Sequence, residues 1–123
     1  MSTRPLVSVV DDDESVRESL PDLLRELGFE ARTFSSAEEF LVSESLQHTR
    51  CLLLDIAMPG MSGPELHQEL VRQRRMIPVV FITANPAANI RPQLLQAGAV
   101  DCLTKPFSEG SLLSAVKAAL GEF

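Results

Sequence analysis

Carboxylates follow directly after two apolar runs of the sequence. Asp11 and Asp12 come after Leu6 to Val10, and Asp55 comes after Cys51 to Leu54. A short, continuous apolar run is typical of a strand buried on both faces, as in a parallel sheet covered by helices. An ionised carboxylate does not belong in such a core. We therefore expect these acids at the carboxyl ends of their strands, in the crevice where open α/β sheets bind ligands.

Such a cluster of acids predicts a bound cation. If the first and third strands are neighbours, as in the strand order 2-1-3-4-5, their carboxylates share one pocket and repel each other unless a cation neutralises them. Mg²⁺ suits oxygen ligands and keeps waters for a phosphate. Lys105 and Thr83 end two further strands and add a positive charge and a hydroxyl donor. Together these groups favour phosphoryl transfer to a carboxylate nucleophile.

Each feature taken singly also has an ordinary structural explanation. The Asp-rich turn could simply cap a helix, Asp55 could be a turn residue, Lys105 could be a solvated surface charge, and Thr83 could fill a strand. Their shared position at strand ends argues against coincidence.

The rest of the chain supplies alternating strands and helices that position these residues. The apolar patterns predict strands over Leu6–Val10, Phe29–Phe34, Cys51–Asp55, Ile77–Thr83 and Ala99–Thr104. Helices are predicted between them: one capped by Asp13 and ending at Gly28, one after a Ser36–Glu39 capping box, one starting at Ser62–Glu65, one over Arg91–Ala97, and one capped by Ser108. Five β-α units indicate an α/β, flavodoxin-like (βα)5 doubly wound sandwich with a five-stranded parallel sheet of order 2-1-3-4-5.

Composition narrows the class of protein. The 123 residues fit one domain, 1–123, and the net charge of −6 makes direct binding to a phosphate backbone a poor prospect. No run approaches the length of a membrane span and no signal peptide opens the chain, so we expect a cytoplasmic protein without a membrane partner. Cys51 and Cys102 are expected to be reduced and buried, and their spacing from His48 and His67 fits no zinc motif.

The chain resembles the receiver domain of two-component response regulators over nearly its whole length. The resemblance lies in the segments Val10-Asp11-Asp12-Asp13-Glu14, Leu54 to Gly63, Thr83-Ala84 and Lys105-Pro106-Phe107. Within the family it is most similar to receivers joined to LuxR-type helix-turn-helix DNA-binding domains. The resemblance implies a signalling domain that catalyses only its own phosphorylation and dephosphorylation, with a sensor histidine kinase as partner.

Specific roles follow from the resemblance. Asp55 would accept a phosphoryl group from a phosphohistidine of the kinase. Asp12 and Asp55 would bind Mg²⁺ together with the backbone carbonyl of Ala57, and Asp11 would act through water.

At the other side of the pocket, Lys105 would pair with a phosphoryl oxygen, and Thr83 would move to hydrogen-bond it. The peptide bond between Lys105 and Pro106 is expected to be cis, as is usual in the family.

Three positions depart from the family pattern. Cys102 replaces the usual Tyr or Phe that switches rotamer with the threonine, so we expect signalling to run through the loop after Thr83 and the following helix. The segment Asn85–Asn89 follows Ala84, and we expect its proline, Pro86, together with Pro92 to stiffen or shorten it. Ala57 cannot orient water, so we expect a long-lived phosphorylated form.

Other functions remain open at this point. A receiver-like interaction module that never accepts phosphate is the main alternative, because of Cys102. A flavodoxin-like cofactor carrier would need a phosphate loop where this chain has four acids, and an Asp-x-Asp phosphatase would need an acid at Ala57. The chain could be a stand-alone receiver or part of a transcription factor that binds DNA only through another domain, with phosphorylation controlling a homodimer.

Overall fold

Strands and helices alternate along the chain. The structure is a computed structural model that describes residues 4–84 and 90–121. The strands are β1 (Leu6–Val10), β2 (Glu30–Phe34), β3 (Thr49–Asp55), β4 (Val79–Thr83) and β5 (Asp101–Thr104). The helices are α1 (Glu14–Glu26), α2 (Ala37–Leu41), α3 (Gly63–Arg72), α4 (Arg91–Gln96) and α5 (Glu109–Ala119), with a 3-10 turn, η1 (Glu44–Gln47).

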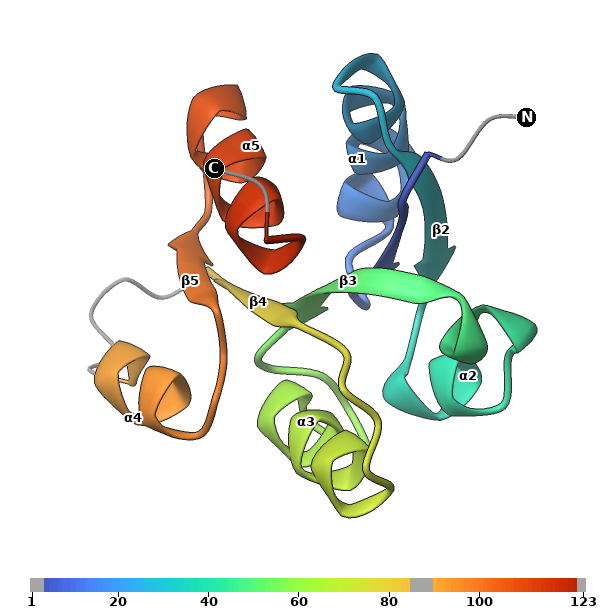
Figure 1. Cartoon of the computed structure of the whole chain (residues 1–123), viewed down its shortest axis with the longest axis vertical. Coiled ribbons are helices and arrows are strands. Elements are labelled where there is room, and N and C mark those ends of the chain that lie inside the picture. Colours follow the sequence, from blue (N-terminus) through green and yellow to red (C-terminus); the bar gives the residue numbers. More distant parts are fainter. Residues whose placement is uncertain (1–3, 85–89, 122–123) are drawn as a thin grey trace.

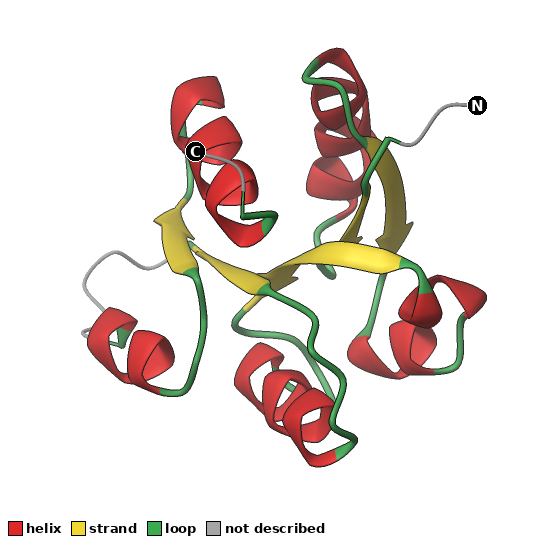
Figure 2. Cartoon of the chain, viewed as in Figure 1, coloured by secondary structure: helices red, strands yellow, loops and turns green. Residues whose placement is uncertain are grey.

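The five strands form one parallel sheet of order β2-β1-β3-β4-β5, which confirms the predicted fold class. Figure 1 shows α1 and α5 on one face of the sheet and α2, α3 and α4 on the other. Figure 2, in the same view, shows the alternation of strands and helices and the loops among the described residues. In this topology the order reverses between β1 and β3, so the crevice for a ligand lies at their carboxyl ends.

Alternate residues of the strands fill two separate cores. On β3, Cys51 and Leu53 pack toward α1 and α5, whereas Leu52 and Leu54 pack toward the other three helices. All four side chains are fully buried, as expected for a strand covered on both faces. Among the described residues, no helix is both long enough and apolar enough to cross a membrane.

Several element boundaries differ from the sequence prediction. β3 begins two residues earlier, at Thr49. β4 begins after Pro78, which has no N–H for a ladder hydrogen bond. β5 begins at Asp101, because the N–H of Ala99 is used to close α4 on the carbonyl of Leu94. The 3-10 turn η1 was not predicted.

Two smaller predictions were also only partly correct. Ser36 caps α2 as expected, but the Glu39 side chain accepts a hydrogen bond from Ser35 instead of completing the capping box. Both cysteines are free, but only Cys51 is buried, and Cys102 is half-buried. The predicted stiff segment Asn85–Asn89 lies outside the described residues.

Gly63 allows the start of α3 to pack directly on the end of β3. A Cβ built on Gly63 would overlap the carbonyl oxygen of Asp55 and lie 3.1 Å from the Cα of Ile56. The N–H of Gly63 donates to the carbonyl of Ile56 at 3.0 Å. Since the obstructing atoms are backbone, a side chain at residue 63 could be accommodated only by moving the strand end that carries Asp55.

We therefore predict that Gly63→Ala lowers the free energy of unfolding by about 1–3 kcal/mol, the usual cost of overpacking a core. Gly110→Ala is the matched control, because Gly110 also lies at the start of a helix and its added Cβ would approach only the Ser108 Oγ, at 3.9 Å. It should be neutral or stabilising. Urea unfolding followed by circular dichroism measures both, and equal effects would contradict the packing explanation.

Candidate functional site

Three carboxylates meet where β1 and β3 end. One oxygen from each of Asp11, Asp12 and Asp55 lies within 4.8 Å of the others. Asp11 and Asp55 are buried, with exposed fractions of 0% and 7%, whereas Asp12 is exposed. The predicted acidic cluster is therefore present at the predicted edge of the sheet.

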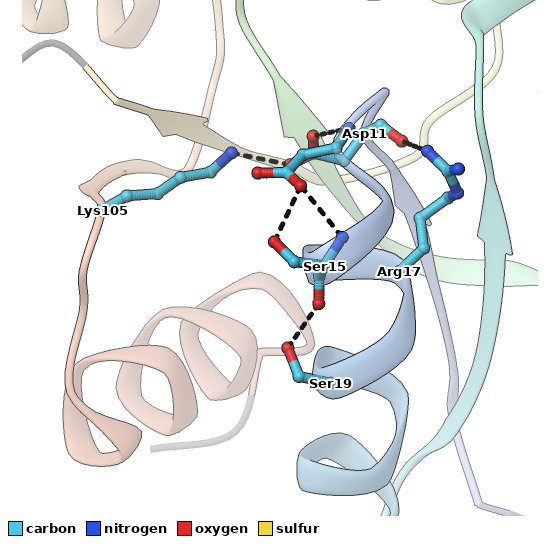
Figure 3. Close-up of polar contacts among 6 residues, drawn as sticks. Asp11, Ser15, Arg17, Ser19 and Lys105 are labelled. Atoms are coloured by element: carbon cyan, nitrogen blue, oxygen red, sulfur yellow. Dashed lines mark hydrogen bonds and ion pairs between the residues drawn. The ribbon is translucent and has the colours of Figure 1, made fainter.

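The carboxylate of Asp11 is held on both of its oxygens. Its Oδ1 accepts a hydrogen bond from the N–H of Asp13 at 2.9 Å, and its Oδ2 accepts one from Lys105 Nζ at 3.0 Å. The Arg17 guanidinium donates to the Asp11 carbonyl at 2.8 Å, from the side opposite Lys105 (Figure 3). The Asp11 N–H donates to the carbonyl of Phe34. These contacts fix both the backbone and the side chain of Asp11.

Lys105 reaches this cluster from the end of β5. Its N–H donates to the carbonyl of Thr83 at 2.8 Å, so the two strand ends stay in register. Burial alone would lower the pKa of Lys105, but its hydrogen bond with Asp11 and the nearby carboxylate charges outweigh burial and raise it. The amine is therefore held as a cation beside the acids. The Lys105–Pro106 peptide bond is cis, as the resemblance implied.

The predicted site residues surround one cavity of about 390 Å³. It is lined by Asp12, Asp13, Asp55, Ile56, Ala57, Thr83, Ala84, Ile90 and Lys105. Asp11 is not in the lining and lies behind it. The hydroxyl-bearing Thr83 is buried at the end of β4, and Ala57 is exposed in the turn after β3. The cavity thus brings together residues from four separate loops.

The surroundings of Asp55 disfavour its ionised form. Burial raises its pKa to about 7, the charges of Asp11 and Asp12 act in the same direction, and the charge of Lys105 opposes them. Lys105 is bonded to Asp11 and not to Asp55. A cation placed among the three acids would remove this penalty, since an opposite charge favours the ionised carboxylate.

The donor set fits a hard divalent cation. All three groups offer carboxylate oxygens, and such ions prefer oxygen ligands with part of the shell left to water. Asp11 already accepts hydrogen bonds on both oxygens, which favours an indirect role for it. An acidic cluster of this kind is typical of the metal site of receiver domains.

Some residues that shape the site were missed from the sequence. Arg17 and Asp13 fix Asp11, and Glu38 of α2 accepts a hydrogen bond from the N–H of Met61 in the turn after β3. In each of these contacts one partner is a backbone group. Because every residue type carries the same backbone, no pairing of side-chain types in the sequence could indicate them.

The raised pKa of Asp55 predicts a specific pH dependence of stability for the metal-free protein. The folded state holds the Asp55 proton up to about pH 7, whereas the ordinary value is 3.8. The folded state therefore binds more protons in this range, and stability falls as the pH rises from 4 to 7 and then levels off. We expect the free energy of unfolding to fall by up to about 1.4 kcal/mol per pH unit relative to Asp55→Asn.

The Asp55→Asn variant is needed as the reference because other groups also titrate. Burial lowers the pKa of His67, so that group stabilises the fold above its ordinary pKa and this stability is lost as the pH falls below 6.5, the opposite direction. Urea unfolding of both proteins between pH 4.5 and 8.5, without divalent cations, separates the two effects. A difference between the proteins that does not change with pH would contradict the prediction.

Comparison with known proteins agrees with the resemblance seen in the sequence. The family model described as the response regulator receiver domain matches residues 7–117. Nodulation protein W of Bradyrhizobium diazoefficiens is 44% identical over 96% of this chain and 52% of its own length. Transcriptional regulatory protein FixJ of Azorhizobium caulinodans is 36% identical over 94% of this chain and 54% of its own.

A solved structure of the response regulator StyR shares 48% identity with this chain and superposes with a TM-score of 0.86, over 97% of this chain and 60% of that one. The chain spans about half the length of the curated relatives it matches. The match of the family model nevertheless covers the five strands, apart from Leu6 of β1, and most of α5. The chain therefore belongs to the family of response regulator receiver domains.

Proposed function

We propose that this receiver accepts a phosphoryl group on Asp55 in a Mg²⁺-dependent reaction and thereby switches an output. The observation that carries the proposal is that two buried acids at the same edge of the sheet have different surroundings. Asp11 is bonded to Lys105 and to the Asp13 N–H, whereas Asp55 lines the cavity with a pKa raised to about 7. A carboxylate that lines a cavity beside a fixed cation is suited to act as a nucleophile.

The proposed donor is a phosphohistidine of a sensor histidine kinase. An oxygen of Asp55 forms a bond to phosphorus as the N–P bond of the donor breaks, and the imidazole nitrogen keeps the electron pair. Lys105 and Thr83 line the same cavity as Asp55, and Lys105 Nζ, which donates to Asp11 at 3.0 Å, would turn to a phosphoryl oxygen. Both groups would then stabilise the charge on the transferred group.

Asp12, Asp55 and the Ala57 carbonyl are the proposed ligands of Mg²⁺, with Asp11 acting through water. The bound ion would neutralise the acids and the charge on the phosphoryl oxygens. Exposed Asp12 and the cavity-lining Ala57 leave room for waters in the remaining shell.

We propose control of transcription as the output, with DNA bound through a domain outside this chain. Support comes from the relatives, several of which are described as transcriptional regulatory proteins. The acidic receiver would act indirectly, through a homodimer that forms on phosphorylation. It would work in the cytoplasm, where a sensor kinase can reach it.

The switch is proposed to run through α4 and not through a rotating aromatic residue. Cys102 is half-buried and pairs in register with Phe81 of β4, and its side chain is too small to exchange between two sites. Ala84 and Ile90 line the cavity on either side of the segment that precedes α4. A group attached to Asp55 would therefore lie in the same cavity as Ala84 and Ile90, the residue directly before α4.

The central prediction is that acetyl phosphate adds one phosphoryl group to the wild-type chain in the presence of Mg²⁺. Intact-mass spectrometry should show the gain, and EDTA should abolish it. Asp55→Asn should show none, because it removes the nucleophilic oxygen while keeping nearly the same shape. A wild-type chain that gains no phosphoryl group would favour the phosphate-independent interaction module instead.

A second prediction concerns the lifetime of the phosphorylated form. Ala57 is exposed in the cavity and offers no hydrogen bond to an attacking water. The Asn side chain in Ala57→Asn would add a hydrogen bond to that water, worth about 0.5–1.5 kcal/mol. Dephosphorylation should therefore be about 3–10-fold faster in the variant. Loss of the phosphoryl mass over time in Mg²⁺ measures both rates. Equal rates, or rapid loss from the wild type, would contradict the expected long lifetime.

A further inference from the structure

The turn that carries Ala57 is fixed at both ends by backbone hydrogen bonds. The N–H of Ile56 donates to the carbonyl of Ile82 at 3.1 Å, and the N–H of Gly63 donates back to the carbonyl of Ile56 at 3.0 Å. Between these points Met58 is buried, whereas Ala57, Pro59 and Gly60 are exposed. The middle of the turn therefore needs another restraint if the Ala57 carbonyl is to keep one direction.

Glu38 supplies a restraint from a different element. Its Oε2 accepts a hydrogen bond from the N–H of Met61 at 3.1 Å, across 23 residues of sequence. Gly60 lies directly beside this carboxylate with φ +74°, and a Cβ on it would come within 2.9 Å of the same oxygen. The glycine makes room for Glu38, but glycine is also the residue whose backbone rotates most freely. The hydrogen bond to Met61 immobilises the chain next to this pivot.

We propose that Glu38 is a positioning residue of the metal site. By holding the N–H of Met61, it fixes the turn that presents the Ala57 carbonyl to Mg²⁺. The inference rests on the proposed function, because it takes that carbonyl as a metal ligand. Partners that orient a ligand in this way commonly affect metal affinity strongly although they never touch the ion.

The neighbouring residue offers a matched control. Glu39 lies on the same helix turn, is also exposed and carries the same charge, but its side chain bonds to Ser35 and not to the turn after β3. Glu39→Ala therefore removes the same charge as Glu38→Ala and leaves the restraint in place. Glu38→Gln removes the charge and keeps an oxygen that can accept from the N–H of Met61.

The experiment is a titration of the four proteins with MgCl₂, followed by amide chemical shifts in NMR spectra. We expect Glu38→Ala to weaken Mg²⁺ binding about 3–10-fold, the equivalent of one hydrogen bond. Glu39→Ala and Glu38→Gln should stay within about twofold of the wild type. In the metal-free protein, the Met61 amide should exchange with solvent faster in Glu38→Ala alone.

Each result decides the inference. Wild-type affinity in Glu38→Ala, or an equal loss in Glu39→Ala or Glu38→Gln, would overturn the positioning role and leave the proposed function standing. A wild-type chain that does not bind Mg²⁺ would overturn both. Urea unfolding of Glu38→Ala should match the wild type closely, which separates a local effect on the turn from general loss of structure.

Discussion

The placement of two buried carboxylates side by side is the constraint on which the rest of the structure depends. Burial limits how far water can screen the repulsion between Asp11 and Asp55. The fold places the two acids in different surroundings. Asp11 receives an ammonium group and a backbone N–H, whereas Asp55 lines the cavity and its pKa is raised to about 7. This asymmetry leaves one of the two acids available for chemistry and makes the other part of the scaffold.

Backbone hydrogen bonds hold the acids in place more than side-chain contacts do. The ends of β1, β3, β4 and β5 are tied across the sheet by N–H to carbonyl bonds that continue past the regular ladder, such as Ile56 to Ile82 and Lys105 to Thr83. Gly63 lets α3 start against the end of β3 with no side chain between them. Burial and repulsion can therefore raise the pKa of Asp55 without pushing its side chain out of the cavity, because the strand ends are restrained by their neighbours.

The sequence could predict the sheet and the location of the acids because both depend on simple patterns. An apolar run such as Cys51 to Leu54 requires a strand that is buried on both faces. The polar residue that ends the run must then lie at the end of that strand. The limits of β4 and β5 and the partial exposure of Cys102 were harder to predict from the sequence. They depend on how neighbouring elements pack and on which backbone groups those elements use. The restraints by Arg17 and Glu38 were not predictable for the same reason.

Among the helices around the site, α4 has the weakest local support. α3 begins with a complete capping box between Ser62 and Glu65, whereas Ile90 precedes α4 without a side-chain cap. α4 has six residues, and Leu94 is its buried one. Its ion pair to β5, from Arg91 to Asp101, is partly exposed and so contributes little to stability. Elements with few buried residues and no side-chain cap shift at low free-energy cost. In the proposed switch, a helix of this kind, next to a cavity lined by Ile90, would respond to a new group on Asp55 although Cys102 offers no aromatic ring to rotate.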